Sequence, residues 1–219
     1  MLLLIYRDDG RLTRSRKNIA WRIEIDIHQL LSLLSGIIFA AAFLPYIIAI
    51  LRRQTVPSTF TWGLWALLDI VTFVAMIGEG AQSLWLVGMG IAGASTVTLL
   101  SLKFGERSIN KVNITCTIMV ILAVICKTQG AGMLALVAGL VGLMIAAITL
   151  IINAWKNPAS EDRTGWILFV LSGLVAMVAV SDCKVLADIL PPMTFSVIDI
   201  TILSIVVFRP KLTSVIANV

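Results

Sequence analysis

The sequence predicts an all-α membrane protein with seven transmembrane helices. Of its 219 residues, 59% are hydrophobic and 13% are charged, and the mean hydropathy is +1.00. Soluble domains carry about 25% charged residues, so most of the surface of this chain is expected to face lipid. Several apolar stretches reach the roughly 20 residues that a helix needs to cross a bilayer. They lack the alternation of polar and apolar residues that is typical of membrane strands.

The apolar stretches follow a basic N-terminal tail, 1–29, and precede a short C-terminal tail, 209–219. The loops between them are clusters of Arg, Lys, Gly, Pro, Asn and Ser, which favour turns. They are short, so neighbouring helices are expected to run antiparallel, and the fourth helix is expected to be the shortest. The predicted helices are 30–51, 59–77, 83–102, 112–126, 131–154, 164–181 and 185–208.

The stretch 44–77 is predicted to be a helical hairpin in the bilayer. Its basic turn, 52–58, places long cationic side chains where they can reach lipid headgroups. Pro57 cannot continue a helix that arrives from the N-terminal side. Ser58 or Thr59 can accept a hydrogen bond from the first free N–H groups of the next helix. The turn therefore separates the first two membrane helices.

An internal repeat becomes visible when the chain is shifted by 104 residues. Trp62 then falls on Trp166, and Arg52 falls on Lys156. This register pairs the first three helices with the last three and leaves the fourth as a linker. An odd number of helices in each unit, plus one linker helix, gives both units the same orientation, which is a parallel repeat. Further matches are Ile47 and Ile48 on Ile151 and Ile152, Leu64 on Leu168, Leu67 on Leu171, Val71 on Val175, and Val74 and Ala75 on Val178 and Ala179.

The hairpin resembles the SWEET and PQ-loop (MtN3/saliva) transporter superfamily. It has a proline near the end of a membrane helix, then a basic loop, a Ser/Thr cluster and an aromatic-rich helix. The dipeptide Pro45-Tyr46 stands where the family has Pro-Gln. The resemblance implies a 3+1+3 plan, with bundles at 30–103 and 131–208 joined by the linker segment 104–130. It also implies transport of a small polar solute, such as a sugar, by alternating access.

Basic residues in the loops predict the orientation of the chain. The positive-inside rule places the more basic set of loops in the cytoplasm, together with the C-terminus, as the resemblance also implies. A bacterial plasma membrane is the expected location. The basic tail favours the opposite orientation, which would resemble the nicotinamide riboside transporters and indicate a vitamin-precursor facilitator. One set of loops and the C-terminal tail hold Arg52, Arg53, Lys103, Arg107, Lys111, Lys156, Arg163, Arg209 and Lys211, whereas the other loops hold Lys127 and Lys184.

Two carboxylates are expected near the middle of the membrane, Asp69 and Asp199. A charge at this depth costs a few kcal/mol and is by default a functional candidate. They could bind a cationic or polyhydroxyl substrate or carry a coupling proton. Alternatively, hydroxyls such as Thr72, Thr201 or Ser204 cap them and they only hold helices together. Because Asp199 falls on Ser95 in the repeat, and the resemblance implies that the third helix of each unit lines the path, Ser95 and Thr96 are expected to face Asp199.

Tryptophans and prolines complete the candidate set. Trp62, Trp65 and Trp166 form either an aromatic belt at the headgroups or a stacking wall for the substrate. Pro45 and the pair Pro191-Pro192 are expected to interrupt the first and last helices and to serve as hinges. In the 104-residue register, Pro45 corresponds to Thr149, so the first helix of each unit would not bend in the same way.

Most chemical functions have little support in the sequence. One histidine and three scattered cysteines predict no metal site, cofactor or catalytic triad. Basic residues confined to loops and a tail argue against nucleic acid. The expected partners are a small solute and lipid, and a homo-oligomer is left open. The alternatives are a non-transporting receptor or assembly protein and, with least support, an intramembrane enzyme that uses the two aspartates.

Overall fold

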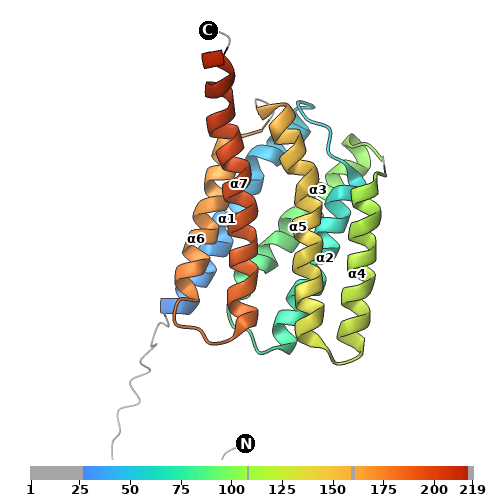
Figure 1. Ribbon diagram of the computed structural model, residues 1–219, viewed down its shortest axis with the longest axis vertical. Coiled ribbons are helices and arrows are strands. Elements are labelled where there is room, and N and C mark those ends of the chain that lie inside the picture. Colours follow the sequence, from blue (N-terminus) through green and yellow to red (C-terminus); the bar gives the residue numbers. More distant parts are fainter. Residues whose placement is uncertain (1–26, 108, 159–160, 217–219) are drawn as a thin grey trace, which may run out of the picture.

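The computed structural model describes residues 27–107, 109–158 and 161–216, with side chains up to residue 209. The predicted basic tail therefore lies outside the described residues, except for 27–29, which begin the first helix. The helices are α1 (Ile27–Leu51), α2 (Thr59–Gly78), α3 (Trp85–Phe104), α4 (Lys111–Thr128), α5 (Gly132–Lys156), α6 (Arg163–Ala179) and α7 (Leu186–Ile216) (Figure 1).

Within the described residues, the prediction of an all-α chain with seven helices is confirmed, but not all seven are long enough to be membrane spans. Six helices are long and apolar enough to cross a membrane, judged by length and composition. The exception is α6, which is apolar but has 17 residues, so the expectation that the fourth helix would be shortest is wrong. The last helix also runs past the predicted end at residue 208, because Pro210 lies inside α7 rather than ending it. Its C-terminal part projects beyond the other helices (Figure 1).

Side-chain caps fix where three of the helices begin. Ser58 accepts a hydrogen bond from the Thr61 N–H at the start of α2, as the sequence predicted. Asp162 does the same for the Gly165 N–H at the start of α6. Asn110 caps α4 in the same way. Each cap satisfies an N–H group that has no partner inside its own helix. The Ser58 and Asp162 caps lie 104 residues apart.

Left-handed residues close the ends of α1, α2 and α4. Gly80 and Gly130 both have φ of +77°, and Arg53 has φ of +56°. After each helix, two N–H groups bond back to carbonyls of the last turn; for α1 these are Arg53 N to Ile50 O and Gln54 N to Ala49 O. This is the Schellman arrangement, in which glycine is usual because it has no Cβ. Arg53 is the exception.

The prolines do not interrupt the helices. Pro45 lies inside the continuous helix α1, and Pro191 and Pro192 lie within the early turns of α7. The expected interruptions are therefore wrong. Within a membrane, neighbouring groups can satisfy a carbonyl that loses its partner to proline, so a helix tolerates the residue. Their use as hinges stays a prediction.

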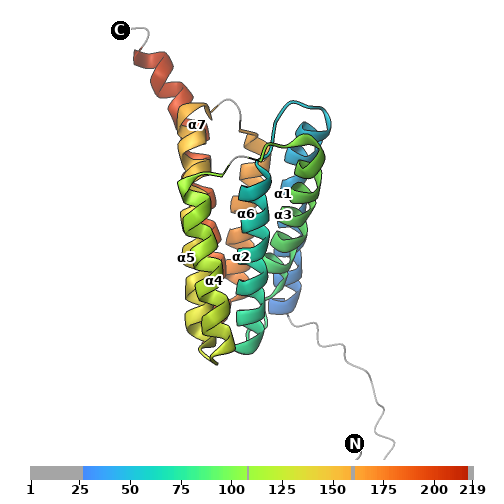
Figure 2. The ribbon, with the colours of Figure 1, turned by 90° about the vertical axis from the view of Figure 1, so that its right-hand side faces the viewer.

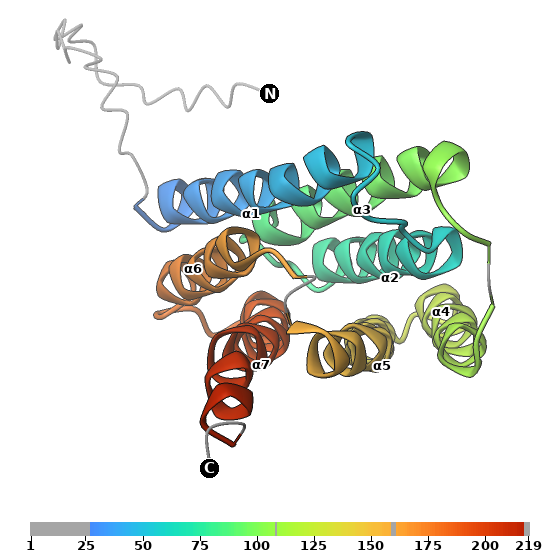
Figure 3. The ribbon, with the colours of Figure 1, turned by 90° about the horizontal axis from the view of Figure 1, so that it is seen from above.

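We call α1–α3 the first triplet and α5–α7 the second triplet. In the first, α3 contacts both α1 and α2; in the second, α7 contacts both α5 and α6. Between the triplets, α1 packs on α6 and α2 packs on α5, while α4 lies outside against α5 and α2. Figure 3, seen along the helices, and Figure 2, seen from the side, show this arrangement.

Close helix contacts rest on small residues. A Cβ on Gly36 would lie 2.9 Å from the Trp85 carbonyl oxygen, and one on Gly139 would lie 2.5 Å from Thr72 Oγ1. Small residues let membrane helices approach closely, which increases their van der Waals contact. Outward-facing side chains of every helix are large and apolar, as expected for a surface in lipid. The small-residue contacts bring α1 against α3 and α2 against α5.

Candidate functional site

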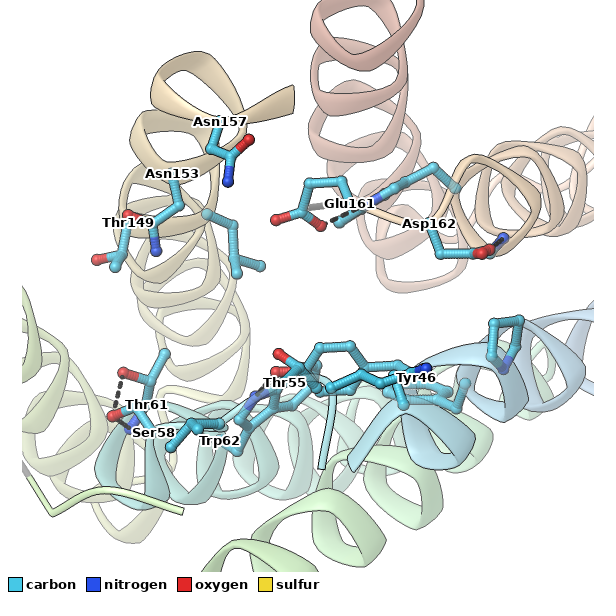
Figure 4. A pocket seen from close by; sticks show the side chains of 18 of the residues that line it. Tyr46, Thr55, Ser58, Thr61, Trp62, Thr149, Asn153, Asn157, Glu161 and Asp162 are labelled. Carbon is cyan, nitrogen blue, oxygen red and sulfur yellow. Dashed lines mark hydrogen bonds between the residues drawn. The ribbon is translucent and has the colours of Figure 1, made fainter. Parts of the chain in front are cut away.

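A cavity of about 1040 Å³ lies between the two triplets at one end of the molecule. We call it the vestibule, and we call this end, which holds the α1–α2, α3–α4 and α5–α6 loops, the vestibule end. Its walls come from the C-terminal halves of α1 and α5 and the first turns of α2 and α6. Polar side chains from both triplets face the space, including Thr55, Thr149, Asn153 and Asn157 (Figure 4).

Two tryptophans anchor the vestibule walls. Trp62 Nε1 donates to the Tyr46 hydroxyl at 3.3 Å, within the first triplet. Trp166 Nε1 donates to Glu161 Oε2 at 3.0 Å, within the second triplet. Burial raises the pKa of Glu161, and the hydrogen bond from Trp166 opposes that rise. Each indole therefore fixes a neighbouring polar group at the cavity wall.

The vestibule is lined by pairs of residues at the register of the sequence repeat. Members of a pair lie 104 residues apart and on opposite triplets. The pairs are Pro45 and Thr149, Tyr46 and Leu150, Ala49 and Asn153, Arg52 and Lys156, Ser58 and Asp162, Thr61 and Gly165, and Trp62 and Trp166. Equivalent positions of the two triplets thus face one space.

A second cavity, of about 40 Å³, shares walls with the vestibule. We call it the inner cavity. The side chains common to both cavities are Phe43, Trp62, Leu150, Trp166 and Phe169. The remaining walls of the inner cavity are Phe39, Trp65, Asp69, Ala94, Phe195 and Asp199. Aromatic rings therefore form most of its surface, and two carboxylates supply its charge.

Asp69 and Asp199 are buried without a hydrogen-bond partner among the described residues. Asp69 is 1% exposed and Asp199 is 5% exposed. Asp69 Oδ1 and Asp199 Oδ2 lie out of contact with solvent and bond to no described atom, and the same holds for Trp65 Nε1. A Cβ on Gly90 would lie 3.0 Å from Asp69 Oδ2, so this glycine leaves room for the carboxylate. Buried polar groups usually have partners, and these two acids depart from that rule.

The hydroxyls that were expected to cap these acids bond elsewhere or not at all. Thr201 Oγ1 donates to the Val197 carbonyl of its own helix at 2.7 Å. Thr72 Oγ1 is buried and has no partner within the described part of the chain. The structure therefore does not supply the hydroxyl caps that a purely structural role for Asp69 and Asp199 would use.

The structure brings together five of the predicted site residues, Asp69, Asp199, Trp62, Trp65 and Trp166, which all line the inner cavity. It does not bring Ser95 and Thr96 to either cavity. Ser95 is half-buried, and Thr96 is exposed and donates to the Ala92 carbonyl of its own helix at 2.7 Å. The expectation that they face Asp199 is wrong, because α3 presents Ala94 to the inner cavity instead.

Several lining residues were not singled out from the sequence. They include Tyr46, Asn153, Glu161 and Asp162 in the vestibule and four phenylalanines in the inner cavity: Phe39, Phe43, Phe169 and Phe195. The repeat could have indicated Asp162, which lies 104 residues after the helix cap Ser58. The phenylalanines carry no such signal, because apolar residues cover every face of these helices.

Comparison of the chain with protein-family models, with curated proteins and with solved structures finds no match. The function is therefore argued from the site.

Proposed function

We propose that this chain is an integral membrane transporter of the SWEET/PQ-loop type, which moves a small polar solute by alternating access without ATP. The observation that carries the proposal is the pair Asp69 and Asp199. Both line an inner cavity that continues the vestibule between the two triplets, and neither has a hydrogen-bond partner in the described part of the chain. A buried carboxylate without a partner is costly, and such residues in membranes mark substrate or ion paths.

The 3+1+3 repeat is part of this proposal. It is supported by the packing, because exchanging α1, α2, α3 for α5, α6, α7 maps the α1–α6 contact onto the α5–α2 contact. It is supported by the equivalent helix caps at Ser58 and Asp162 and by the paired residues of the vestibule. A solute site between two repeats near the middle of the membrane is the arrangement that parallel-repeat transporters use.

Rocking of one triplet against the other would provide alternating access. The vestibule reaches the inner cavity from one end, while hydrogen bonds between the triplets join the other end. Asp188 on α7 accepts from the N–H groups of Gln82 and Ser83, which precede α3. The basic loops lie at the vestibule end, and the positive-inside rule therefore assigns that end and the C-terminus to the cytoplasm.

Uptake into proteoliposomes tests the proposal. A panel of sugars, amino acids, polyamines and nucleosides would first be screened by thermal shift in detergent. A ligand at a hundred times its Kd adds about 2.7 kcal/mol of apparent stability. Each hit would then be tested for uptake with the wild type and with Asp199→Asn. We expect Asp199→Asn to abolish uptake.

Thr96→Val is the matched control for this experiment. Its side chain is exposed and bonds within its own helix, so we expect uptake to be unchanged. Uptake that survives in Asp199→Asn, or no uptake of any bound solute, would remove the support for a transporter and favour a receptor or assembly role.

A further inference from the structure

The inner cavity carries two acids and no basic side chain. Its lining consists of Asp69, Asp199, seven aromatic residues, Ala94 and Leu150. The basic residues that line the connected space, Arg52 and Lys156, lie at the exposed rim of the vestibule. A neutral solute such as a sugar supplies no counter-charge, so neither acid could ionise in this medium of low dielectric constant without a large cost in free energy. A cation offsets this cost.

The volume of the inner cavity limits which cation enters. A water molecule needs about 10–15 Å³ of such volume, so about 40 Å³ accommodates a group the size of an ammonium, with little room beyond it. A sugar ring or a trimethylammonium group exceeds that space. The vestibule, with about 1040 Å³, can hold the rest of a small molecule. The shared wall of Phe43, Trp62, Leu150, Trp166 and Phe169 links the two spaces.

The aromatic walls favour an organic cation over a metal ion. Ca²⁺ and Mg²⁺ take six or more oxygen ligands, whereas this lining offers carboxylates from two residues only. In the described residues, no group of three or more His, Cys, Asp or Glu side chains is placed to hold a metal. Tryptophan faces, by contrast, attract ammonium groups through their electron-rich rings. Trp62, Trp65 and Trp166 all line the inner cavity.

We propose that the solute is a primary amine whose ammonium group occupies the inner cavity between Asp69 and Asp199, with its body in the vestibule against Trp62 and Trp166. The inference names the substrate class of the transporter and therefore rests on the proposed function. The carboxylates of both residues can accept hydrogen bonds from the three N–H donors of the ammonium. The acids that line the vestibule, Glu106, Glu161 and Asp162, make its entrance compatible with a cation.

Benzylamine, benzyl alcohol and benzyltrimethylammonium separate the elements of this proposal. Binding to the purified protein in detergent would be followed by tryptophan fluorescence and by thermal shift. We expect benzylamine to bind, and benzyl alcohol, which has the same ring without charge, to bind at least tenfold more weakly. We expect the same weakening for benzyltrimethylammonium, which keeps the charge but has a larger head without N–H donors. Equal binding of all three compounds would overturn the proposal.

Substitutions of the lining residues test where the amine binds. Asp69→Asn and Asp199→Asn should each weaken benzylamine binding at least tenfold. Asp182→Asn is the matched control, because its side chain is 85% exposed outside both cavities, and it should bind as the wild type does. Trp65→Leu leaves both carboxylates in place and removes an aromatic face, so it should weaken benzylamine binding severalfold. This variant tests the site even if an Asn variant fails to fold. Binding that is unchanged in Asp69→Asn, Asp199→Asn and Trp65→Leu would overturn the site.

Uptake distinguishes failure of this inference from failure of the proposed function. Amine binding that depends on Asp69 and Asp199, without uptake into proteoliposomes, would support the amine site and contradict transport. Uptake of a neutral solute by a protein that does not bind benzylamine would support transport and overturn the amine.

Discussion

The two ends of the molecule join the helix triplets differently. At the end opposite the vestibule, which we call the tied end, hydrogen bonds cross between triplets. Asp188 Oδ1 accepts from Gln82 N at 2.9 Å and from Ser83 N at 2.7 Å. His28 Nδ1 of α1 donates to the Ala179 carbonyl of α6, also at 2.9 Å. At the vestibule end, the Trp62 and Trp166 indoles bond within their own triplets. Under the proposed transport function, the tied end would be the pivot and the vestibule end the entrance.

The buried acid at the tied end and the two buried acids of the inner cavity have different surroundings. Asp188 is as buried as Asp69, at 1% exposure, yet its carboxylate receives two backbone N–H groups. Asp69 and Asp199 receive none in the described part of the chain. Burial by itself therefore does not distinguish an acid that joins helices from an acid that is available to a ligand. The hydrogen-bond partners make the distinction.

The largest effect is expected for Asp188→Ala. It removes two charge-assisted hydrogen bonds, each worth about 1.5–3 kcal/mol, and leaves two N–H groups without an acceptor. We expect the free energy of unfolding to fall by about 3 kcal/mol in thermal or denaturant unfolding. The tied end should also open, so that Ser32→Cys, which is buried in the wild type, reacts with an impermeant maleimide.

The labelling requires a background in which Cys116, Cys126 and Cys183 are replaced by alanine. Asp182→Ala is the control, because the exposed Asp182 carboxylate lies near the same end and, among the described side chains, pairs with His28 at 3.8 Å. A loss below about 1 kcal/mol for Asp188→Ala, with Ser32→Cys still protected, would show that Asp188 does not hold this end.

Substitution of the two acids of the inner cavity should not lower stability as substitution of Asp188 does. Asp69→Asn and Asp199→Asn replace a buried carboxylate without a partner by a neutral amide. We expect neither to lower the free energy of unfolding measured without ligand, because no hydrogen bond to the carboxylate is lost. Asp188→Asn should lower it. A decrease in all three variants would mean that the inner acids are held by partners, as Asp188 is.

The turns that end the helices should show a smaller difference. Gly80 and Gly130 lie at the tied end with φ of +77° and no atom within 4 Å of an added Cβ. Gly80→Ala and Gly130→Ala should therefore each lower the free energy of unfolding by only about 1 kcal/mol, which is the cost of a left-handed backbone for alanine. Arg53 occupies the equivalent left-handed position at the vestibule end, and Arg53→Gly should stabilise the protein by a similar amount. No gain in thermal unfolding for Arg53→Gly would indicate that the arginine side chain compensates for its backbone.

The smallest effect concerns pH at the vestibule wall. Burial raises the pKa of Glu161 above 4.5 in the folded protein, so the folded state binds its proton more tightly than the unfolded state. The stability from this group is present below pH 4.5 and is lost as pH rises through the raised pKa. We expect the free energy of unfolding to decrease across that window, and Glu161→Gln should remove this decrease. Trp166→Phe removes the opposing hydrogen bond and should move the window to higher pH.

Sequence reasoning located the helices because local signals fix them. Ser58 was expected as a cap and is one, and the apolar lengths gave helix positions within a few residues of those observed, except for the C-terminal end of α7. It also identified Asp69 and Asp199 as buried, since no loop lies near them. It failed for Ser95 and Thr96, which were assigned to the path through the repeat register of α3.

By itself, the sequence determined that this chain is helical with apolar segments long enough to cross a membrane, where most of its helices begin and end, and that Asp69 and Asp199 lie inside it. Only the tertiary structure decided which side chains meet. It placed Asp69 beside the same cavity as Asp199, turned Thr96 away, and gave Asp188 its two donors. The physical reason is that a membrane helix is apolar on its lipid face and on its packed face, so its pattern does not fix its rotation about its axis. Contacts with neighbouring helices fix that rotation, and the rotation decides which residues face the cavity.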